Sequence, residues 1–252
     1  MAKYGSAEVG FLLVGPYNLT NVSSKIEDSA TRTTEDMTPF GTSIAVVAAS
    51  PVVHFELTGH EGWYDDAADS INAAMVGMAS TATILMMAVK GNTAGKLAVC
   101  SSGAIRTGYK RSFAVGEYHK ASMELAITGI RDEATIVYPL TLTSGDGSTE
   151  AADLDLGAAG GGTTGCNVYF SCTQLALTGS TNLIVTFEDS SDAITYAPQT
   201  AMTALTVVGA EYKASVDQTV NRYVAAKWVF TGLAGTPTAT FALAVKVNAP
   251  HA

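Results

Sequence analysis

The sequence predicts a mainly β protein with one helix. Strand-like runs of apolar and β-branched residues recur along the chain, Gly-rich turns separate them, and a single stretch has helical periodicity. The strongest turn signals are residues 144–149 and 157–165. We therefore expect two β domains, residues 1–145 and 146–252, with a boundary near Gly145.

The first half predicts strands separated by turns. The expected strands are residues 9–14, 52–58, 83–90, 96–100, 104–113, 117–128 and 134–143, with a hairpin loop at 92–95. Residues 59–66 predict a turn that leads into a helix of about four turns, which Asp65 or Asp66 can cap. The buried face of this helix is expected at Ile71, Ala74, Met75 and Met78, and Gly77 and the polar run at residues 80–83 are expected to end it.

Residues 18–41 are polar and follow no period, which predicts a long loop or arm. Loops of this length are uncommon inside compact domains and usually have a function. An arm that reaches a neighbouring subunit is one such function. The candidate contact residues are Asn18, Lys25, Glu27, Asp28, Arg32, Glu35, Asp36 and Pro39.

The second half reads as strands and turns. The expected strands are residues 153–156, 167–177, 182–188, 203–208, 211–216, 222–231 and 238–247. Strand runs of this length between short turns predict a β-sandwich, immunoglobulin-like or jelly-roll-like.

The composition favours assembly over nucleic-acid binding. Only 15% of the residues are charged and 47% are hydrophobic, which fits extensive subunit contact. The net charge of −9 and the lack of an arginine-rich tail argue against tight binding to phosphates. The most basic stretch is Tyr109, Lys110 and Arg111, interpreted as a solvated strand face, with a phosphate or partner role as the alternative.

The cysteines and apolar runs suggest no export or membrane span. Cys100, Cys166 and Cys172 form neither a disulfide framework nor a zinc pattern, so we expect small buried residues in a reducing cell. The apolar run at residues 11–14 lacks the features of a signal peptide, and residues 84–89 are too few to cross a bilayer. The chain is expected to be made in the cytoplasm.

No catalytic, cofactor-binding or metal-binding constellation is predicted, so the chain is not expected to be an enzyme. Asp65, Asp66 and Asp69 are interpreted as capping and solvated residues, with a metal as the minor alternative. Four aromatic residues of the second half could line a sugar platform, although core positions fit them better: Tyr169, Tyr196, Tyr223 and Trp228.

Several short motifs of residues 7–143 resemble the major tail proteins of long-tailed, non-contractile phages. A Phe-Gly turn at Phe40 precedes the strand Phe55-Glu-Leu-Thr58, and Glu61-Gly-Trp-Tyr-Asp-Asp leads into the helix. Residues 91–95 and 117–122 fit the same pattern.

The second half resembles an accessory β-sandwich of phage tail and other virion proteins. The matching segments are residues 153–157, 187–190, 221–224 and 235–241. Two features depart from the family pattern: Tyr196 stands where another aromatic residue is often seen, and Cys166 and Cys172 are not family marks.

The resemblance implies a tail-tube-like β-sandwich or barrel with one flanking helix, which assembles as stacked six-fold rings around a DNA-conducting lumen. It implies partners among other tail proteins, DNA that passes without specific binding, and a virion location. An outer sandwich could contact host glycans weakly. The alternatives are a capsid decoration or other virion surface protein, and a carbohydrate-binding module.

Overall fold

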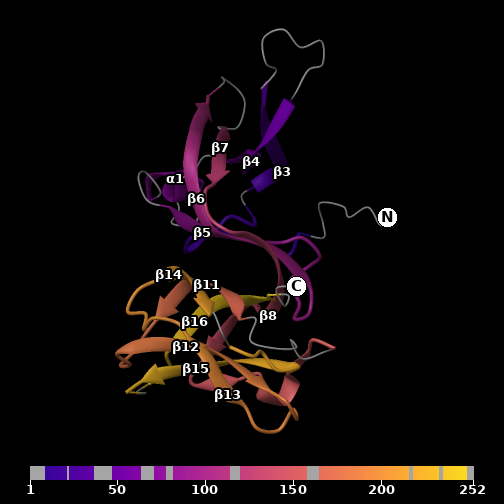
Figure 1. Cartoon of the computed structure of the whole chain (residues 1–252). Helices are drawn as coiled ribbons and strands as arrows, with labels where there is room; N and C mark the ends of the chain where they lie inside the picture. The colour runs from indigo at the N-terminus through magenta and orange to yellow at the C-terminus, as the bar shows by residue number, and fades with distance from the viewer. Residues whose placement is uncertain are drawn as a thin grey trace. The chain divides into compact units, whose positions relative to one another are not determined.

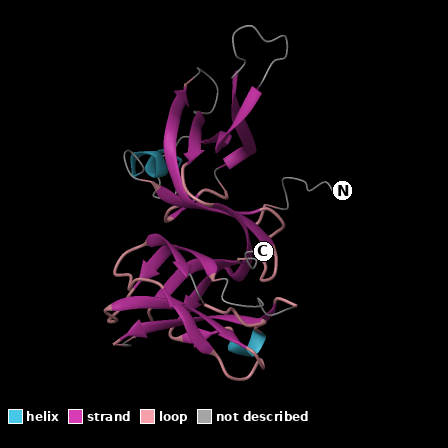
Figure 2. Cartoon of the chain, viewed as in Figure 1, coloured by secondary structure: helices cyan, strands magenta, loops and turns pink. Residues whose placement is uncertain are grey.

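The computed structural model describes residues 9–21, 23–36, 47–63, 71–77, 82–113, 120–157, 165–215, 218–232 and 235–248. The protein is mainly β, with two sheets of antiparallel strands (Figure 1). Within these ranges there is one short α-helix, beside a single 3-10 turn (Figure 2). The predicted fold class is confirmed at this level.

The chain divides into two compact units that alternate along the sequence. Unit 1 comprises residues 1–20, 83–102 and 131–252, and unit 2 comprises residues 21–82 and 103–130. Unit 2 is thus formed by two excursions of a chain that begins and ends in unit 1. The boundary predicted near Gly145 falls inside unit 1, and the independence of residues 146–252 stays a prediction.

Unit 1 contains most of the strands. Its larger sheet has the order β14-β11-β16-β8-β6-β5-β1-β2, and its smaller sheet joins β10, β15, β12 and β13, with β9 paired to β15. The bounds are β1 Phe11–Val14, β2 Tyr17–Asn18, β5 Thr83–Ala88, β6 Leu97–Ser112, β8 Arg131–Ser144, β9 Gly147–Ser148, the 3-10 turn Glu150–Ala152, β10 Leu154–Asp155, β11 Cys166–Ala176, β12 Asn182–Ser190, β13 Ala197–Ala201, β14 Gly209–Ser215, β15 Tyr223–Thr231 and β16 Thr238–Val247.

The two sheets of unit 1 pack face to face as a sandwich. Phe170 of β11 and Phe241 of β16 share one core with Phe187 of β12 and Trp228 of β15. The opposite face of the larger sheet is also buried, because Tyr169 and the small residues Ala242 and Ala244 pack there against β1 and β5. Burial on both faces explains why β11 lacks the apolar–polar alternation of a half-exposed strand.

Unit 2 is a four-stranded antiparallel ladder with a helix. Its order is β3 (Ser23–Asp36), β4 (Val47–Trp63), β7 (Lys120–Ile127) and the second part of β6. β6 belongs to both units: residues 97–101 pair with β8, and residues 104–112 pair with β7. The helix α1 spans Ile71–Gly77 and buries Ile71 and Ala74, as predicted.

Several predicted element bounds are wrong. Residues 96–100 and 104–113 form one strand, and residues 59–63, expected in a turn, continue β4. A register shift between Leu57 and His60 accommodates Gly59 inside the β4–β7 ladder. The described helix has 7 residues and ends at Gly77, while Asp65, Asp66 and Asp69 lie outside the described residues.

Residues 203–208 do not form the predicted strand. Only Leu205 makes a bridge, to Leu183. The amide and hydroxyl of Thr203 donate instead to the carboxylate of Glu211, at 2.6 and 2.7 Å, so a side chain replaces the strand partner. The sequence analysis also missed β13, which contains Pro198 and, among the described strands, pairs with β12 alone.

Candidate assembly interface

The predicted arm is a β-hairpin for much of its length. β3 pairs antiparallel with β4, from Ser23 opposite Gly62 to Asp36 opposite Val47. The expectation of a loop is therefore wrong for residues 23–36. Threonines such as Thr31 favour strand geometry. A strand rich in polar residues shows no alternation of apolar and polar side chains, so this pattern did not reveal β3.

β3 is the outermost strand of the unit 2 ladder. Among the strands that the structure describes, β3 pairs with β4 alone, whereas β4 also pairs with β7. One edge of a 14-residue strand is thus left without a partner strand within the described ranges. Three register shifts, at Ser23/Lys25, Lys25/Glu27 and Arg32/Thr34, increase the local twist of this hairpin.

The eight candidate contact residues fall into three places. Asn18 lies in β2 of unit 1, where its side-chain oxygen accepts hydrogen bonds from the amide and hydroxyl of Thr20 at 3.1 and 2.5 Å. Pro39 lies outside the described residues. The other six share β3 and unit 2: Lys25, Glu27, Asp28, Arg32, Glu35 and Asp36.

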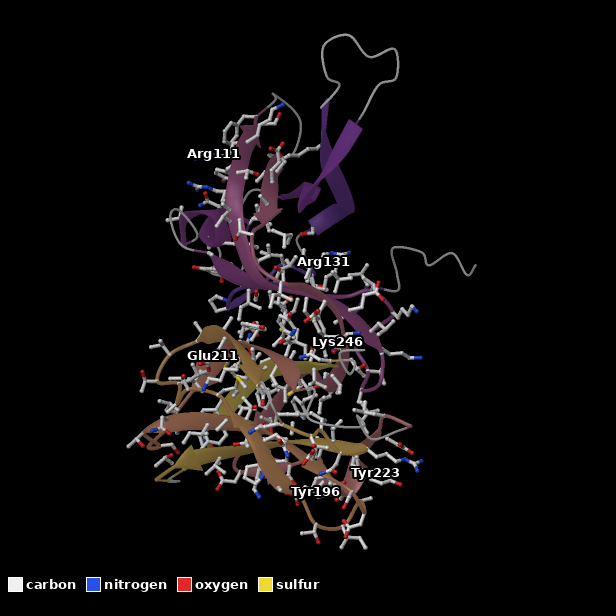
Figure 3. The ribbon with its side chains drawn as sticks, viewed as in Figure 1. Arg111, Arg131, Tyr196, Glu211, Tyr223 and Lys246 are labelled. Carbon is white, nitrogen blue, oxygen red and sulfur yellow. The ribbon has the colours of Figure 1, made fainter. Side chains whose placement is uncertain are left out.

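Two of the four aromatic residues of the second half are too buried to line a sugar platform. Tyr169 is fully buried and Trp228 is 8% exposed, with its indole packed against Tyr138 and Phe241. Tyr196, which Figure 3 labels together with Tyr223, donates its hydroxyl hydrogen to Asp153. The core interpretation is confirmed for Tyr169 and Trp228, and stacking on a sugar needs accessible rings.

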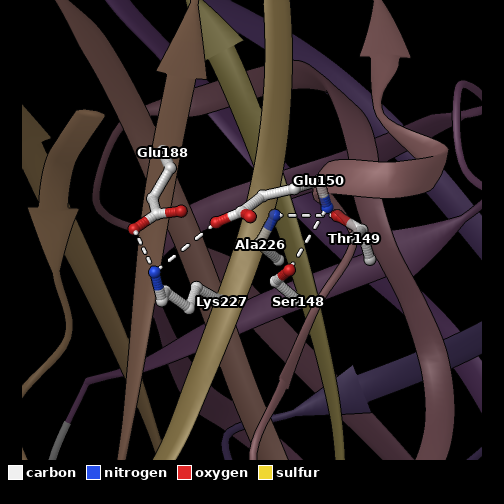
Figure 4. A network of polar contacts seen from close by, with 6 residues as sticks. All are labelled: Ser148, Thr149, Glu150, Glu188, Ala226 and Lys227. Carbon is white, nitrogen blue, oxygen red and sulfur yellow. Dashed lines mark hydrogen bonds and ion pairs between the residues drawn. The ribbon is translucent and has the colours of Figure 1, made fainter. Parts of the chain in front are cut away.

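The structure brings together a polar cluster that the sequence analysis missed. Lys227 Nζ lies 3.5 Å from Glu150 Oε1 and 3.6 Å from Glu188 Oε1 (Figure 4). Burial of the Glu188 carboxyl and its proximity to Glu150 raise its pKa, while Lys227 lowers it in part. The pairing of β15 with both β12 and β9 brings this cluster together, whereas 38 residues separate the two acids in the sequence.

This carboxylate pair has a structural role in unit 1. Glu188 is 4% exposed, so no substrate can reach its carboxyl. A glycosidase needs both acids beside the glycosidic bond that it cleaves. Ser148 and Thr149 beside the cluster bond the backbone, with Thr149 Oγ1 accepting from Ala226 N at 2.9 Å. The cluster fastens the 3-10 turn to β15.

Metal and membrane features can be assessed over the described ranges. No group of three or more His, Cys, Asp or Glu residues there could hold a metal ion. The described part of the chain has no helix with the length and apolar character of a membrane span. Cys100, Cys166 and Cys172 are buried and free, as predicted, and burial raises the pKa of each thiol, to about 12 for Cys166 and Cys172.

No family model and no curated protein matches the sequence. The chain is similar to several solved structures, at low TM-scores. The tail of an empty GTA particle, refined with C6 symmetry, covers 52% of this chain and 98% of its own at 13% identity and a TM-score of 0.38. A chain of the native gene transfer agent virion has the same coverage and identity, with a TM-score of 0.39. The SPP1 Dit protein, called a paradigm of the hub adsorption apparatus in phages that infect Gram-positive bacteria, covers 94% of this chain and 98% of its own at 10% identity and a TM-score of 0.32.

Proposed function

We propose that this chain is a non-enzymatic structural protein of a phage or gene-transfer-agent tail. In the finer form of the proposal it polymerises as stacked, hexameric rings into the tail tube that conducts DNA during ejection. The observation that carries the proposal is β3, a 14-residue outer strand with one unpaired edge among the described strands.

A long open edge favours pairing with another chain. Its unsatisfied N–H and C=O groups form a ready template for a further strand, and soluble monomers commonly shorten or cover such edges. A second copy of this chain can satisfy these groups by adding a strand to β3. The same contact repeated around an axis gives a ring.

The charge on β3 argues against pairing between the β3 strands of two subunits. The strand contains four acids and two bases, a net charge of −2. Two β3 strands side by side would bring like net charges together, which is unfavourable across a ladder. Pairing of β3 with a different strand of the neighbour is a heterologous contact, and heterologous contacts generate closed rings or filaments.

Other features support the same proposal. The motifs described above resemble those of major tail proteins. The six-fold symmetry of the proposed ring is what this resemblance implies. The low charge content leaves surface suited to subunit contacts. The burial of Tyr169 and Trp228 disfavours a carbohydrate-binding module. The proposal retains an accessory β-sandwich in the C-terminal half, other tail proteins as partners, and at most weak glycan contact.

The first test is negative-stain electron microscopy of the purified protein over a concentration series. The tube proposal predicts uniform hollow tubes or stacked rings. Single rings that do not stack would favour a hub-like tail component. Monomers that persist at all concentrations, and that bind preformed heads, would favour a decoration protein instead.

A pair of proline variants tests the role of the β3 edge. Adjacent residues of an antiparallel strand direct their N–H groups alternately toward and away from the partner strand. One of the substitutions Ala30→Pro and Thr31→Pro therefore removes an outward donor and spares the β3–β4 ladder. That variant should stay folded by circular dichroism and form no rings. Normal rings from both folded variants would contradict a contact through β3.

A further inference from the structure

The β6–β7 ladder has one face covered by the helix. Tyr109 stands opposite Met123 and Arg111 opposite Ala121, so these residues share a face. Met123 and Ala121 are buried there, and Tyr109 OH donates to Asn72 Oδ1 of α1 at 2.9 Å. Arg111, labelled in Figure 3, lies 5.5 Å from the centre of the Tyr109 ring. The guanidinium group of Arg111 thus packs near the Tyr109 ring, on the face that the helix covers.

The opposite face of the ladder carries a compact set of donors. Lys110 stands opposite Ser122, and Ser112 opposite Lys120. Because residues two apart on a strand share a face, all four side chains emerge on the side away from α1. Together with Ala121, which lies between Lys120 and Ser122 in the strand, they line a pocket of about 180 Å³. Lys110, Ser112 and Lys120 are exposed, and Ser122 is half-buried.

The spacing of these four residues suits one tetrahedral oxyanion. Directly opposite Cβ atoms lie about 5 Å apart, and neighbours along one strand about 7 Å apart. The two lysines occupy one diagonal of this rectangle and the two serines the other. Two ammonium groups and two hydroxyl groups can therefore donate to an anion above the centre, which would also relieve the repulsion between the lysines.

A nearby acid limits the size of the site. Glu124 stands opposite Gly108 in the register, where a Cβ atom would come within 3.0 Å of its Cδ. Within the described part of the chain, Lys110 and Lys120 make no ion pair with a carboxylate. The basic area is thus restricted to a single phosphate-sized group.

We propose that Lys110, Ser112, Lys120 and Ser122 form a phosphate-binding site for the sugar–phosphate backbone of DNA. The identity of the ligand as DNA rests on the proposed function, in which DNA passes along the assembled protein. The contact reads no base sequence, because phosphates carry none. It would give transient holding points on a chain whose overall charge of −9 repels DNA.

The salt dependence of binding measures the proposed contact. A site that neutralises one phosphate gives a slope of about −0.9 in a plot of log affinity against log salt concentration. Raising the salt tenfold, from about 20 to about 200 mM, should therefore lower the affinity of the wild type for a double-stranded 20-mer about 8-fold. Fluorescence anisotropy with the labelled 20-mer gives this slope at protein concentrations below assembly.

Three variants distinguish binding at the proposed site from the effect of removing a positive charge elsewhere on the protein. The double variant K110Q/K120Q should bind the 20-mer almost independently of salt. The control K96Q removes an exposed lysine of unit 1 and should keep the wild-type slope. The variant S112A/S122A should weaken binding without changing the slope, since it removes donors and no charge. Equal slopes for K110Q/K120Q and the wild type, or an equal loss in K96Q, would overturn the proposal.

Electron microscopy of the same variants keeps the two proposals apart. K110Q/K120Q should assemble as the wild type does, because the substitutions lie on a ladder face and not on β3. Failure of the wild type to form rings would contradict the tail function while leaving the anisotropy result intact. A wild type that forms rings but shows no lysine-dependent slope would remove the phosphate site alone.

Discussion

The indole of Trp228 lies directly against Gly147, its partner across the β15–β9 ladder. A Cβ atom at Gly147 would sit 2.5 Å from Cζ2 and 2.8 Å from Cε2 of the ring. The ring is held in this position, because its Nε1 donates to the carbonyl of Gly145 at 3.0 Å and the ring packs against Tyr138 and Phe241. Position 147 therefore requires glycine, because any larger side chain would clash with the indole ring.

Replacing Gly147 by alanine should destabilise the protein. The added methyl group must displace a ring that packs against two other aromatic residues, and overpacking of this kind costs about 1–3 kcal/mol. Urea unfolding of the full chain measures the change. The matched background is W228F, which removes the ring that carries Cζ2, and there G147A should cost about 1 kcal/mol less. An equal cost in both backgrounds would assign the effect to the backbone.

Replacing Tyr169 by phenylalanine should also lower stability. The Tyr169 hydroxyl donates to Asp132 Oδ2 at 2.7 Å, and Asn167 Nδ2 donates to the same oxygen at 2.7 Å. Loss of a hydrogen bond to a charged group costs about 1.5–3 kcal/mol. Thermal unfolding at neutral pH measures it, and Y223F at a half-buried tyrosine serves as the control.

The same variant should differ from the wild type at high pH. Burial, followed by the bond to Asp132, raises the pKa of Tyr169 above that of an unfolded tyrosine. The folded state therefore holds this proton more tightly, and its stabilising effect is present below pH of about 10 and is lost as the pH rises further. Y169F should lack this loss. Parallel stability curves for the two proteins above pH 10 would contradict the assignment.

Replacing Glu188 by glutamine should alter the response to mild acid. Burial raises the pKa of Glu188, and Oε2 of its carboxyl has no donor among the described residues. Because the folded state binds this proton more tightly, the contribution of Glu188 to stability should grow as the pH falls from 7 toward the unfolded value of about 4.3. E188Q should lack this gain and be at least as stable as the wild type at pH 7. The control is E133Q at an exposed glutamate, and a wild-type acid response of E188Q would refute the prediction.

Residues 146–252 alone test the domain boundary near Gly145. β16 pairs with β8 from Thr238 opposite Ser144 to Val245 opposite Thr135, and Val137 and Tyr138 of β8 belong to the sandwich core. A fragment without β8 exposes this core and one edge of β16. We expect it to unfold at lower urea than fragment 131–252, as measured by circular dichroism. Equal midpoints would show that a domain begins at residue 146.

The sequence was most informative where local signals suffice. β16 begins and ends where its apolar run does, at Thr238–Val247, and α1 ends at Gly77 with Ile71 and Ala74 buried. Turn residues and side-chain periodicity act over a few residues, so they can be read without knowing the fold. The mainly β class and the lack of a disulfide framework follow from the same kind of information.

The candidate interface depended on contacts between distant residues. β3 is a strand because β4 supplies its hydrogen bonds, and nothing within residues 23–36 alone signals that partner. Lys110 and Lys120 lie ten positions apart in the sequence, and only the β6–β7 register places them on one face with Ser112 and Ser122.

Local side-chain patterns alone thus determined the mainly β class and the strands with a clear apolar run, such as β16. The tertiary structure decided which strands are neighbours, which edge stays open, and which face the helix covers. The physical reason is that strand pairing joins backbone groups far apart in the chain, so a side-chain pattern predicts a strand but leaves its partner unspecified.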